Sequence, residues 1–425
     1  MKTETIEFVS GAEKEIFQVP KKNLVKILSP RPYFSDISPE ELIKKSLEHP
    51  IESEPLDCLL QNASSVAIIV DDATRQTPTQ LVLRYVIEKL KKVGIKKENV
   101  VIQIANGLHR LTNIEEKERI CGEEVLKEFQ VFDNDPNTDR YEYYGITSNG
   151  TPLYFNKRVT STDFIIPIGM IKSHSFAGFT GGAKSIVPGI SARETILANH
   201  RFDYIEYPNG TLGNCERSAV RRDMEEAASK LPLFIINVVL NKEGQIVDVV
   251  SGNVIAAHRK GVETFEKMAS VYLNEPIDIA IIEGGLPGSI SLYQAIFGCN
   301  AVLTTKRPIL KKGGTIILFA PCYEGVGDEI IEELFEKYKD PTKVLNHLKN
   351  SLPVPGQWAA QSLAYFLLNS ELCIVNSQIS QEKLETLGIT YHKSIQESLN
   401  FYLSKNERLK VAVIKDPDFL IPNLE

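Results

Sequence analysis

The chain has few cysteines, few histidines and a single tryptophan. Of its 425 residues, 6 are Cys, 7 are His and 1 is Trp. No two cysteines form a C-x-x-C pair, so their spacing is typical neither of a disulfide framework nor of a zinc ribbon. We therefore expect buried, reduced thiols, as in a cytosolic protein. The cysteines are Cys58, Cys121, Cys215, Cys299, Cys322 and Cys373.

The sequence also has no excess of basic residues and no long apolar run. The net charge is −7 at pH 7, whereas a general nucleic-acid binder needs a basic face, so nucleic acid is not an expected partner. No apolar run approaches the roughly 18 residues of a membrane span, so a membrane is not expected either. The first residues, MKTETIEFVSGAEKEIF, are polar and charged, unlike a signal peptide. We expect a cytoplasmic protein.

The order of apolar and amphipathic segments predicts an α/β protein. The chain is long for one domain, and short apolar runs alternate with helical stretches, which is typical of mostly parallel sheets. A break near NEP at 274–276 suggests two α/β domains, an N-terminal one over 1–272 and a smaller one over 273–425. The runs IDIAIIE, GGTIILF, LCIVNS and LKVAVIKD supply buried-type strands to the second.

Helix signals place several helices in the first part. Pro78 stands at the start of an amphipathic stretch, and a polar helix is expected over 114–129. Ser191, with Glu194 three residues later, predicts a capping box for a helix that starts near Ala192 and ends near His200. A longer helix is expected over 254–272.

Three predicted strands run into loops that carry chemically useful side chains. These loops contain DDATR, ANGLHR and KSHSFAG. In open α/β sheets, ligands bind beyond the carboxyl ends of the strands. We therefore expect these loops to build a common site.

The segment GFTGGAKS at 178–185 differs by one residue from a phosphate-binding P-loop. Ala183 stands where the motif has glycine, and alanine crowds the approach of phosphate to the backbone. Pro188 follows Lys184 by four residues and would break the helix that such a loop requires. A nucleotide triphosphatase is therefore disfavoured. The glycines are interpreted as room for a flat cofactor at Lys184.

Histidine placement favours acid/base chemistry at the strand ends. His109, His174 and His200 lie in or just after the three loops, whereas His49, His258, His347 and His392 are expected to be surface or packing residues. An imidazole can accept and donate a proton near neutral pH. A structural role for each histidine alone remains the alternative.

Arg75, with Asp71 and Asp72, can grip a substrate carboxylate or merely form a charge pair at a helix start. The sequence leaves both interpretations of Arg75 open.

His200 has no second histidine or cysteine at a metal-binding spacing, so a metal held by protein groups alone is disfavoured. A metal carried by an organic cofactor would need only one protein ligand.

Taken together, the motifs resemble those of the nickel-pincer lactate racemase family. The resemblance rests on DDATRQTP, ANGLHR, KSHSFAGFTGGAKSIVPGISARETILANH, SLYQ and GQW, and covers most of the chain. It implies two α/β domains with the active site in the cleft between them. It also implies a nickel-pincer nucleotide, a pyridinium-3-thioamide-5-thiocarboxylic acid mononucleotide, bound covalently to Lys184, with His200 as the protein ligand of its nickel.

By the same resemblance, His109 and His174 are an alternating acid/base pair. One takes the hydroxyl proton of a 2-hydroxy acid while hydride leaves Cα for the cofactor, and hydride then returns to the other face. The resemblance makes Arg75 the carboxylate anchor, with Asp72 beside it. Other matched positions line the cofactor or substrate pocket: Ser173, Ser175, Tyr293, Gln294 and Trp358. A packing role for Trp358 remains the alternative.

One position departs from the lactate-racemising relatives, which carry a lysine three residues after the Tyr-Gln pair. Phe297 stands there, which predicts a roomier, more apolar or differently polar pocket. We therefore expect a 2-hydroxy-acid racemase or epimerase for which lactate is not established as the substrate. The implied partners are the small-molecule 2-hydroxy acid and the enzymes that make the cofactor; the oligomeric state is left open. The rival function is a non-catalytic or cofactor-free binding homologue of the same fold.

Overall fold

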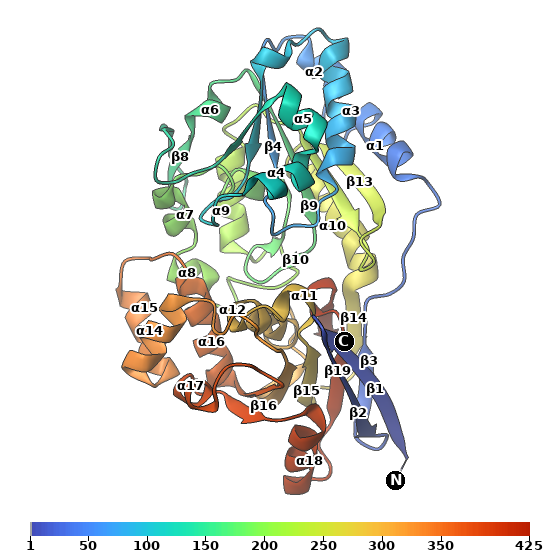
Figure 1. The fold of residues 1–425 in the computed structure, drawn as a ribbon, viewed down its shortest axis with the longest axis vertical. Helices are drawn as coiled ribbons and strands as arrows, with labels where there is room; N and C mark the ends of the chain where they lie inside the picture. Colours follow the sequence, from blue (N-terminus) through green and yellow to red (C-terminus); the bar gives the residue numbers. More distant parts are fainter. Residues whose placement is uncertain (1) are drawn as a thin grey trace.

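The computed structural model describes residues 2–425, except the side chains of Leu286 and Pro287. Figure 1 shows two parts stacked along the long axis, each built around its own sheet, with both chain ends at the lower part. Each sheet has six strands within the described residues, and helices lie on its faces. The predicted α/β class with mostly parallel sheets is confirmed.

The first sheet has the strand order β13-β12-β9-β4-β5-β6, and β13 is the antiparallel member. Its central strands are apolar throughout because both faces are covered. In β4, alternate residues pack on opposite faces, Ile68 with α1 to α3 and Ile69 with α9. The strands are β13 (Ile246–Gly252), β12 (Ile235–Leu240), β9 (Phe164–Ile171), β4 (Val66–Val70), β5 (Val100–Ile104) and β6 (Gln130–Asp133).

Helices α1 to α10 accompany this sheet. They are α1 (Pro39–Glu48), α2 (Leu56–Leu60), α3 (Thr79–Lys92), α4 (Ile114–Cys121), α5 (Glu123–Glu128), α6 (Lys157–Thr160), α7 (Arg193–Asn199), α8 (Phe202–Ile205), α9 (Ala219–Ala228) and α10 (Ala256–Ala269). Two 3₁₀ turns, η1 (Lys97–Asn99) and η2 (Gly182–Ser185), and the hairpins β7 (Tyr141–Ile146)–β8 (Pro152–Asn156) and β10 (Ser173–His174)–β11 (Gly178–Phe179) complete this part.

The second sheet is parallel throughout, in the order β18-β17-β16-β15-β19-β3. The four strands expected in this region are confirmed as β15, β16, β17 and β19. The strands are β18 (Thr390–His392), β17 (Ser370–Val375), β16 (Leu310–Phe319), β15 (Ile277–Glu283), β19 (Val411–Ile414) and β3 (Leu24–Leu28).

Helices on one face of the second sheet form its main core, and α18 covers the other face. The helices are α11 (Gly285–Gly288), α12 (Leu292–Ala295), α13 (Asn300–Leu303), α14 (Glu329–Tyr338), α15 (Pro341–Asn350), α16 (Gln357–Asn369), α17 (Gln381–Thr386) and α18 (Ile395–Lys405). The 3₁₀ turns are η3 (Ile296–Cys299) and η4 (Pro417–Phe419), and β14 (Ser270–Leu273) pairs with β20 (Ile421–Leu424).

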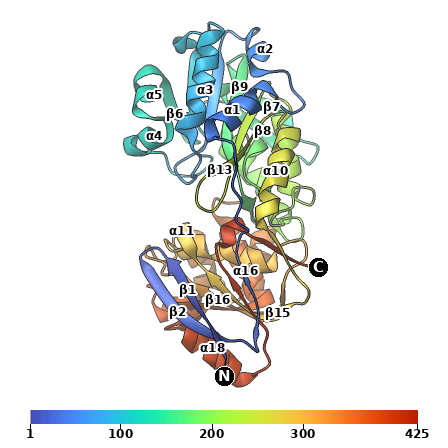
Figure 2. The ribbon, with the colours of Figure 1, turned by 90° about the vertical axis from the view of Figure 1, so that its right-hand side faces the viewer.

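Residues 3–28 of the chain pack with the second part, and their last strand joins its sheet. The hairpin β1 (Thr3–Ser10)–β2 (Glu13–Pro20) packs its alternating apolar side chains, including Phe8 and Phe17, against that sheet beside α18 (Figure 2). β3 then pairs with β19 at the sheet edge. The division of the chain at 272/273 stays a prediction, but its assignment of the first 28 residues to the N-terminal part does not match this strand pairing.

Three local expectations were wrong. The Ser191 hydroxyl does not cap α7, because it is buried and donates to the Ile186 carbonyl (2.7 Å), so the helix begins at Arg193 without a side-chain cap. The polar helix over 114–129 is two helices, α4 and α5, since Gly122 breaks it at φ +90°. The helix expected to reach Tyr272 ends at Ala269, and Tyr272 lies in β14.

None of the helices formed by residues 2–425 is long and apolar enough to cross a membrane.

Candidate active site

Three adjacent parallel strands end at the same edge of the first sheet. β4 lies between β5 and β9, and the loops that follow them carry Asp72, His109 and His174. The expectation that these loops lie together at the carboxyl ends of neighbouring strands is confirmed. In Figure 1, β10, which follows β9, lies where the two parts meet.

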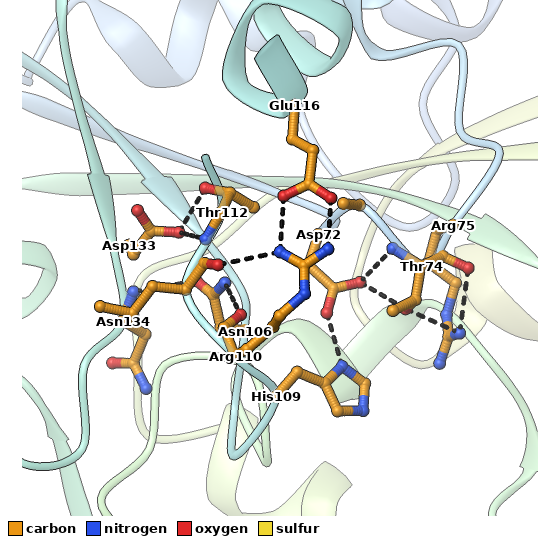
Figure 3. Close-up of polar contacts among 12 residues, drawn as sticks. Asp72, Thr74, Arg75, Asn106, His109, Arg110, Thr112, Glu116, Asp133 and Asn134 are labelled. Carbon is orange, nitrogen blue, oxygen red and sulfur yellow. Dashed lines mark hydrogen bonds and ion pairs between the residues drawn. The ribbon is translucent and has the colours of Figure 1, made fainter. Parts of the chain in front are cut away.

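Asp72 and His109 form a close pair. The Nδ1 atom of His109 lies 2.5 Å from Oδ2 of Asp72 (Figure 3), and Asp72 is only 6% exposed while the histidine side chain is half exposed. Burial raises the pKa of Asp72, but the hydrogen bond and charge of His109 and the charge of Arg75 outweigh it and lower this pKa to about 2. The carboxylate is therefore ionised at neutral pH. It accepts the Nδ1 hydrogen and leaves Nε2 of His109 free to accept a proton.

Thr74 holds the other oxygen of Asp72. Its backbone N–H and its hydroxyl both donate to Oδ1, at 3.1 and 2.6 Å. Nη1 of Arg75 donates to the Thr74 hydroxyl at 3.1 Å, so Arg75, Thr74, Asp72 and His109 form one chain of contacts (Figure 3). Thr74 was missed in the sequence because a threonine between charged residues carries no distinctive signal.

Hydrogen bonds of the neighbouring residues Asn106 and Arg110 fix the loop that carries His109. The His109 N–H donates to the Asn106 carbonyl (2.9 Å), and the Asn106 side chain donates to the Arg110 carbonyl (3.2 Å). Arg110 itself forms a two-pronged ion pair with Glu116 at the start of α4 (2.8 and 2.5 Å; Figure 3). These contacts set the direction of the imidazole toward Asp72.

The side chains of His174 and Lys184 lie close together, with the segment 175–183 joining the two residues. Nζ of Lys184 lies 3.4 Å from Nε2 of His174, while the N–H groups of Phe176 and Ala177 donate to Nδ1 (3.4 and 3.3 Å). Burial, followed by the charges of Lys184 and Arg75, lowers the pKa of His174 well below its usual value. Burial, followed by the charges of Arg75 and Arg221, lowers the pKa of Lys184 well below 10.5. Both groups are thus held toward their uncharged forms.

The two candidate acid/base histidines differ in the partner of Nδ1. In His109 this atom meets a carboxylate and must donate, whereas in His174 it accepts from two N–H groups. In its neutral form, His174 therefore carries the ring hydrogen on Nε2, toward the Lys184 amine. In their neutral forms, the two imidazoles are therefore held in opposite tautomers.

The glycine-rich segment does not form a P-loop. Lys184 lies in the 3₁₀ turn η2, not at the start of an α-helix, which contradicts the triphosphatase alternative. The glycines also serve a purpose other than the expected room for a cofactor. Gly178 and Gly181 have φ of +74° and +73°, and a Cβ there would lie 2.7 Å from the backbone of Asn214 or 2.9 Å from the Asn237 side chain.

His200 lies at the carboxyl end of α7, as expected, and is 5% exposed. The ring of Phe176 stands edge-on between His174 and His200, with centroid distances of 4.6 and 5.2 Å. Burial, with Lys184 and His109, lowers the pKa of His200 to about 3, so its imidazole is neutral. Within residues 2–425, its buried Nδ1 has no hydrogen-bond partner.

One aromatic side chain of the second part, Trp358, reaches His200, and two more follow it. The Trp358 ring lies 5.4 Å from the His200 ring, and its Nε1 donates to the Tyr293 hydroxyl (3.1 Å). Phe297 stands edge-on to Tyr293 at 5.4 Å. Tyr293 and Phe297 come from α12 and η3 after β15, and Trp358 comes from α16. A line of rings therefore runs from His174 to Phe297 across the two parts.

The remaining predicted residues are less closely tied to this cluster. The Ser173 hydroxyl donates to the Asp418 carbonyl (2.8 Å) and so joins the two parts. Ser175 lines a crevice of about 450 Å³ with Phe176, Phe202 and Gln361. No contact within the described residues joins the Gln294 side chain to the other site residues. A second crevice, of about 310 Å³, is lined by Asp72, Thr74, His109 and Glu116.

The fold and the site together define a class of protein. Two α/β parts meet at an edge where an amine held toward its uncharged form, the neutral imidazoles of His174 and His200, and His109 with its ionised partner Asp72 gather. This is the arrangement of an enzyme that moves protons on a small molecule.

Comparisons with known proteins narrow this class. Residues 10–213 match the model of the lactate racemase N-terminal domain, and residues 273–419 match that of the lactate racemase C-terminal domain. A lactate racemase of Thermoanaerobacterium thermosaccharolyticum is 34% identical over 420 residues, 97% of each chain. One of Lactiplantibacillus plantarum is 31% identical over 391 residues, 90% of this chain and 91% of that one.

Solved structures agree. The lactate racemase apoprotein of T. thermosaccharolyticum superposes with a TM-score of 0.90 at 33% identity, over 99% of this chain and 100% of that one. A Thermotoga maritima protein, at 17% identity and a TM-score of 0.68, covers 93% of this chain and 100% of its own and shares the fold. The chain belongs to the lactate racemase family, and its class of activity is that of a racemase, an isomerase.

Proposed function

We propose that the chain is a 2-hydroxy-acid racemase or epimerase that works with a nickel-pincer nucleotide carried on Lys184. The observation that carries the proposal is the Lys184 amine, which lies 3.4 Å from Nε2 of His174 at the same sheet edge as the His109–Asp72 pair, and whose pKa burial lowers well below its usual value. A small molecule would lie between these groups. A cytoplasmic location and dependence on the enzymes that make the cofactor belong to the same proposal.

The residues present fit this cofactor. No group of three or more His, Cys, Asp or Glu side chains able to hold a metal occurs in the part of the chain that the structure describes. An amine with a pKa well below its usual value, as at Lys184, is suited to a covalent bond, and the neutral imidazole of His200 is suited to one bond with nickel. The chemistry that the cofactor supplies when bound is reversible acceptance of a hydride from Cα of the substrate.

The chain's own residues would then manage the substrate and its hydroxyl proton. Arg75 binds the carboxylate, since a guanidinium matches it with two parallel hydrogen bonds. Nε2 of His109 takes the hydroxyl proton of one enantiomer, and the ionised Asp72 stabilises the imidazolium that forms. His174 serves the other enantiomer. To take the hydroxyl proton at Nε2 it must carry its own ring hydrogen on Nδ1, so this role requires the contacts of Nδ1 with the Phe176 and Ala177 N–H groups (3.4 and 3.3 Å) to open. This is the proton of O–H, because histidine removes the Cα proton beside a carboxylate only where metal ions stabilise the enediolate that forms, and the described residues contain no group of side chains able to hold such an ion.

Phe297 supports a substrate other than lactate. The ring packs edge-on against Tyr293, whose hydroxyl binds Trp358, so this wall of the site is apolar and aromatic. Such a wall favours a 2-hydroxy acid with a larger or more apolar substituent.

The test uses protein produced together with the cofactor-making enzymes. We expect its intact mass to show a covalent adduct that is absent from the Lys184→Ala variant, bound nickel, and loss of optical purity in one or more members of a panel of single-enantiomer 2-hydroxy acids. The alternative, a non-catalytic homologue of the same fold, predicts no loss of optical purity with any member. Faster racemisation of lactate than of every larger acid would contradict the substrate proposal alone.

A further inference from the structure

The segment between His174 and Lys184 is held through its backbone carbonyls. Each of the six carbonyls over 176–181 accepts a hydrogen bond from outside the segment. The donors, in order, are the Ser218 hydroxyl (2.6 Å), Nε of Arg221 (3.2 Å), the Gly213 N–H (3.0 Å), Nη2 of Arg221, Nε2 of His258 (2.8 Å) and Nη1 of Arg221 (3.0 Å). Arg221 thus supplies three of the six donors.

Arg221 lies on the inner face of α9 and has no exposed surface. Among residues 2–425 no carboxylate forms an ion pair with it, and the carboxylate of Glu225, one turn further along the helix, pairs instead with Arg259 at 2.8 Å. A buried charge without an ion-pair partner is costly, and here three carbonyl dipoles and the more distant charge of Glu225 stabilise it. A neutral side chain of similar size would avoid that cost. The charge itself is therefore the feature that needs an explanation.

The Gly181 carbonyl links Arg221 to Lys184. It accepts a hydrogen bond from Nη1 of Arg221 and another from the backbone N–H of Lys184 (3.3 Å). The positive charge of Arg221 also contributes to lowering the pKa of Lys184 and of His174. The same guanidinium acts on the backbone and on the charge state of both groups.

We propose that Arg221 is the positioning residue for Lys184: its guanidinium holds the carbonyls of the segment 176–181 so that Lys184 meets His174. The buried positive charge of Arg221 also disfavours protonation of the Lys184 amine. This inference rests on the proposed function, because it is there that Lys184 carries the cofactor. Neither the fold class nor the strand-end pattern points to Arg221, which lies far along the chain in an ordinary amphipathic helix.

Other charged groups also face the Lys184 amine. Arg75 acts in the same direction as Arg221, whereas Asp71 and Asp72 oppose both, and neutral His174 lies in contact. Removing Arg221 alone should therefore raise the pKa of Lys184 without restoring its ordinary value. A change of about one pH unit corresponds to a tenfold change in the uncharged fraction below the midpoint.

The test measures the reactivity of Lys184 in the cofactor-free, full-length protein. The probe is the N-hydroxysuccinimide ester of acetic acid, whose acetyl group passes from the ester oxygen to Nζ, releasing the N-hydroxysuccinimide anion and one proton from the amine. The rate at Lys184 is followed by peptide mass spectrometry from pH 6 to 10, with the exposed lysines of the same sample as internal reference. In the wild type we expect a midpoint well below that of the exposed lysines.

Two neutral variants separate charge from hydrogen bonding. Arg221→Met removes both, and Arg221→Gln keeps amide donors for the carbonyls. Both should raise the Lys184 midpoint by about one unit and slow acetylation at pH 7 about tenfold. Arg222→Met is the matched control, because Arg222 is the next residue of the same helix but is exposed and bonds the Glu216 carbonyl; it should leave the midpoint unchanged.

Three results would overturn the inference. The first is a wild-type Lys184 that reacts like the exposed lysines, and the second is a midpoint unchanged in either variant when circular dichroism shows that it is folded. The third is failure of both variants to fold, since Arg221 would then serve the fold alone. None of these measurements depends on racemase activity of the protein. A raised midpoint in protein that racemises nothing would count against the proposed function only.

Discussion

Replacing Asp72 by asparagine tests the charge state of the Asp72–His109 pair. The pKa of Asp72 lies at about 2 instead of 3.8, which corresponds to about 2 kcal/mol of stability supplied by the ionised carboxylate. A carboxyl with a lowered pKa contributes this stability in full above its unfolded pKa and loses it as the pH falls through the folded value. Asp72→Asn should therefore lower the free energy of unfolding by about 2 kcal/mol at pH 6, and by clearly less at pH 3.

The neighbouring Asp71 supplies a matched control with the opposite sign. Burial raises its pKa above 3.8 despite hydrogen bonds from Thr77 and the Met170 N–H. Ionisation of Asp71 thus costs stability, and Asp71→Asn should become relatively less destabilising as the pH rises from 3 to 6. The assay is urea unfolding of the cofactor-free protein, followed by circular dichroism at both pH values. Equal effects of Asp72→Asn at pH 3 and pH 6, or the same pH trend in both variants, would refute the reasoning.

Three further substitutions probe the site. Thr74→Val removes one charge-assisted hydrogen bond to Asp72 and should lower kcat for racemisation about tenfold, while Thr74→Ser keeps the hydroxyl and most of the rate; equal rates in the two variants would contradict this role. His200→Ala should leave the mass adduct on Lys184 in place but remove most of the nickel, measured by atomic emission on the same sample; full nickel content would exclude His200 as its ligand. Phe297→Lys should raise kcat/KM for lactate relative to a larger 2-hydroxy acid about tenfold, and an unchanged ratio would show that Phe297 does not select the substrate.

Much of the first sheet could be predicted because its information is local. The buried runs of β4, β5 and β9 are continuous and apolar, and each is followed at once by its functional side chains. Parallel strands have their carboxyl ends at the same edge of a sheet, so the three loops could be expected to meet there, whereas the order β5-β4-β9 is known only from the structure. The histidines of these loops were found for the same reason.

The parts that could not be predicted depend on contacts between distant residues. β3 pairs with β19, which lies near the other end of the sequence, and no feature of Leu24–Leu28 indicates which strand it pairs with. Ser191 carries the pattern of a cap, yet its hydroxyl finds the Ile186 carbonyl because the backbone before α7 turns back on itself. Arg221 is one arginine among many until its three carbonyl partners are seen.

In the proposed mechanism, hydride and not a proton leaves the substrate carbon, and the histidines accept and donate only the hydroxyl proton. Racemisation of a single-enantiomer 2-hydroxy acid by cofactor-loaded protein in D₂O tests this most directly, with the deuterium content at Cα of the product measured by mass spectrometry. The account predicts that the Cα hydrogen is retained and that the product carries no deuterium there. Deuterium at Cα in the inverted product would contradict it.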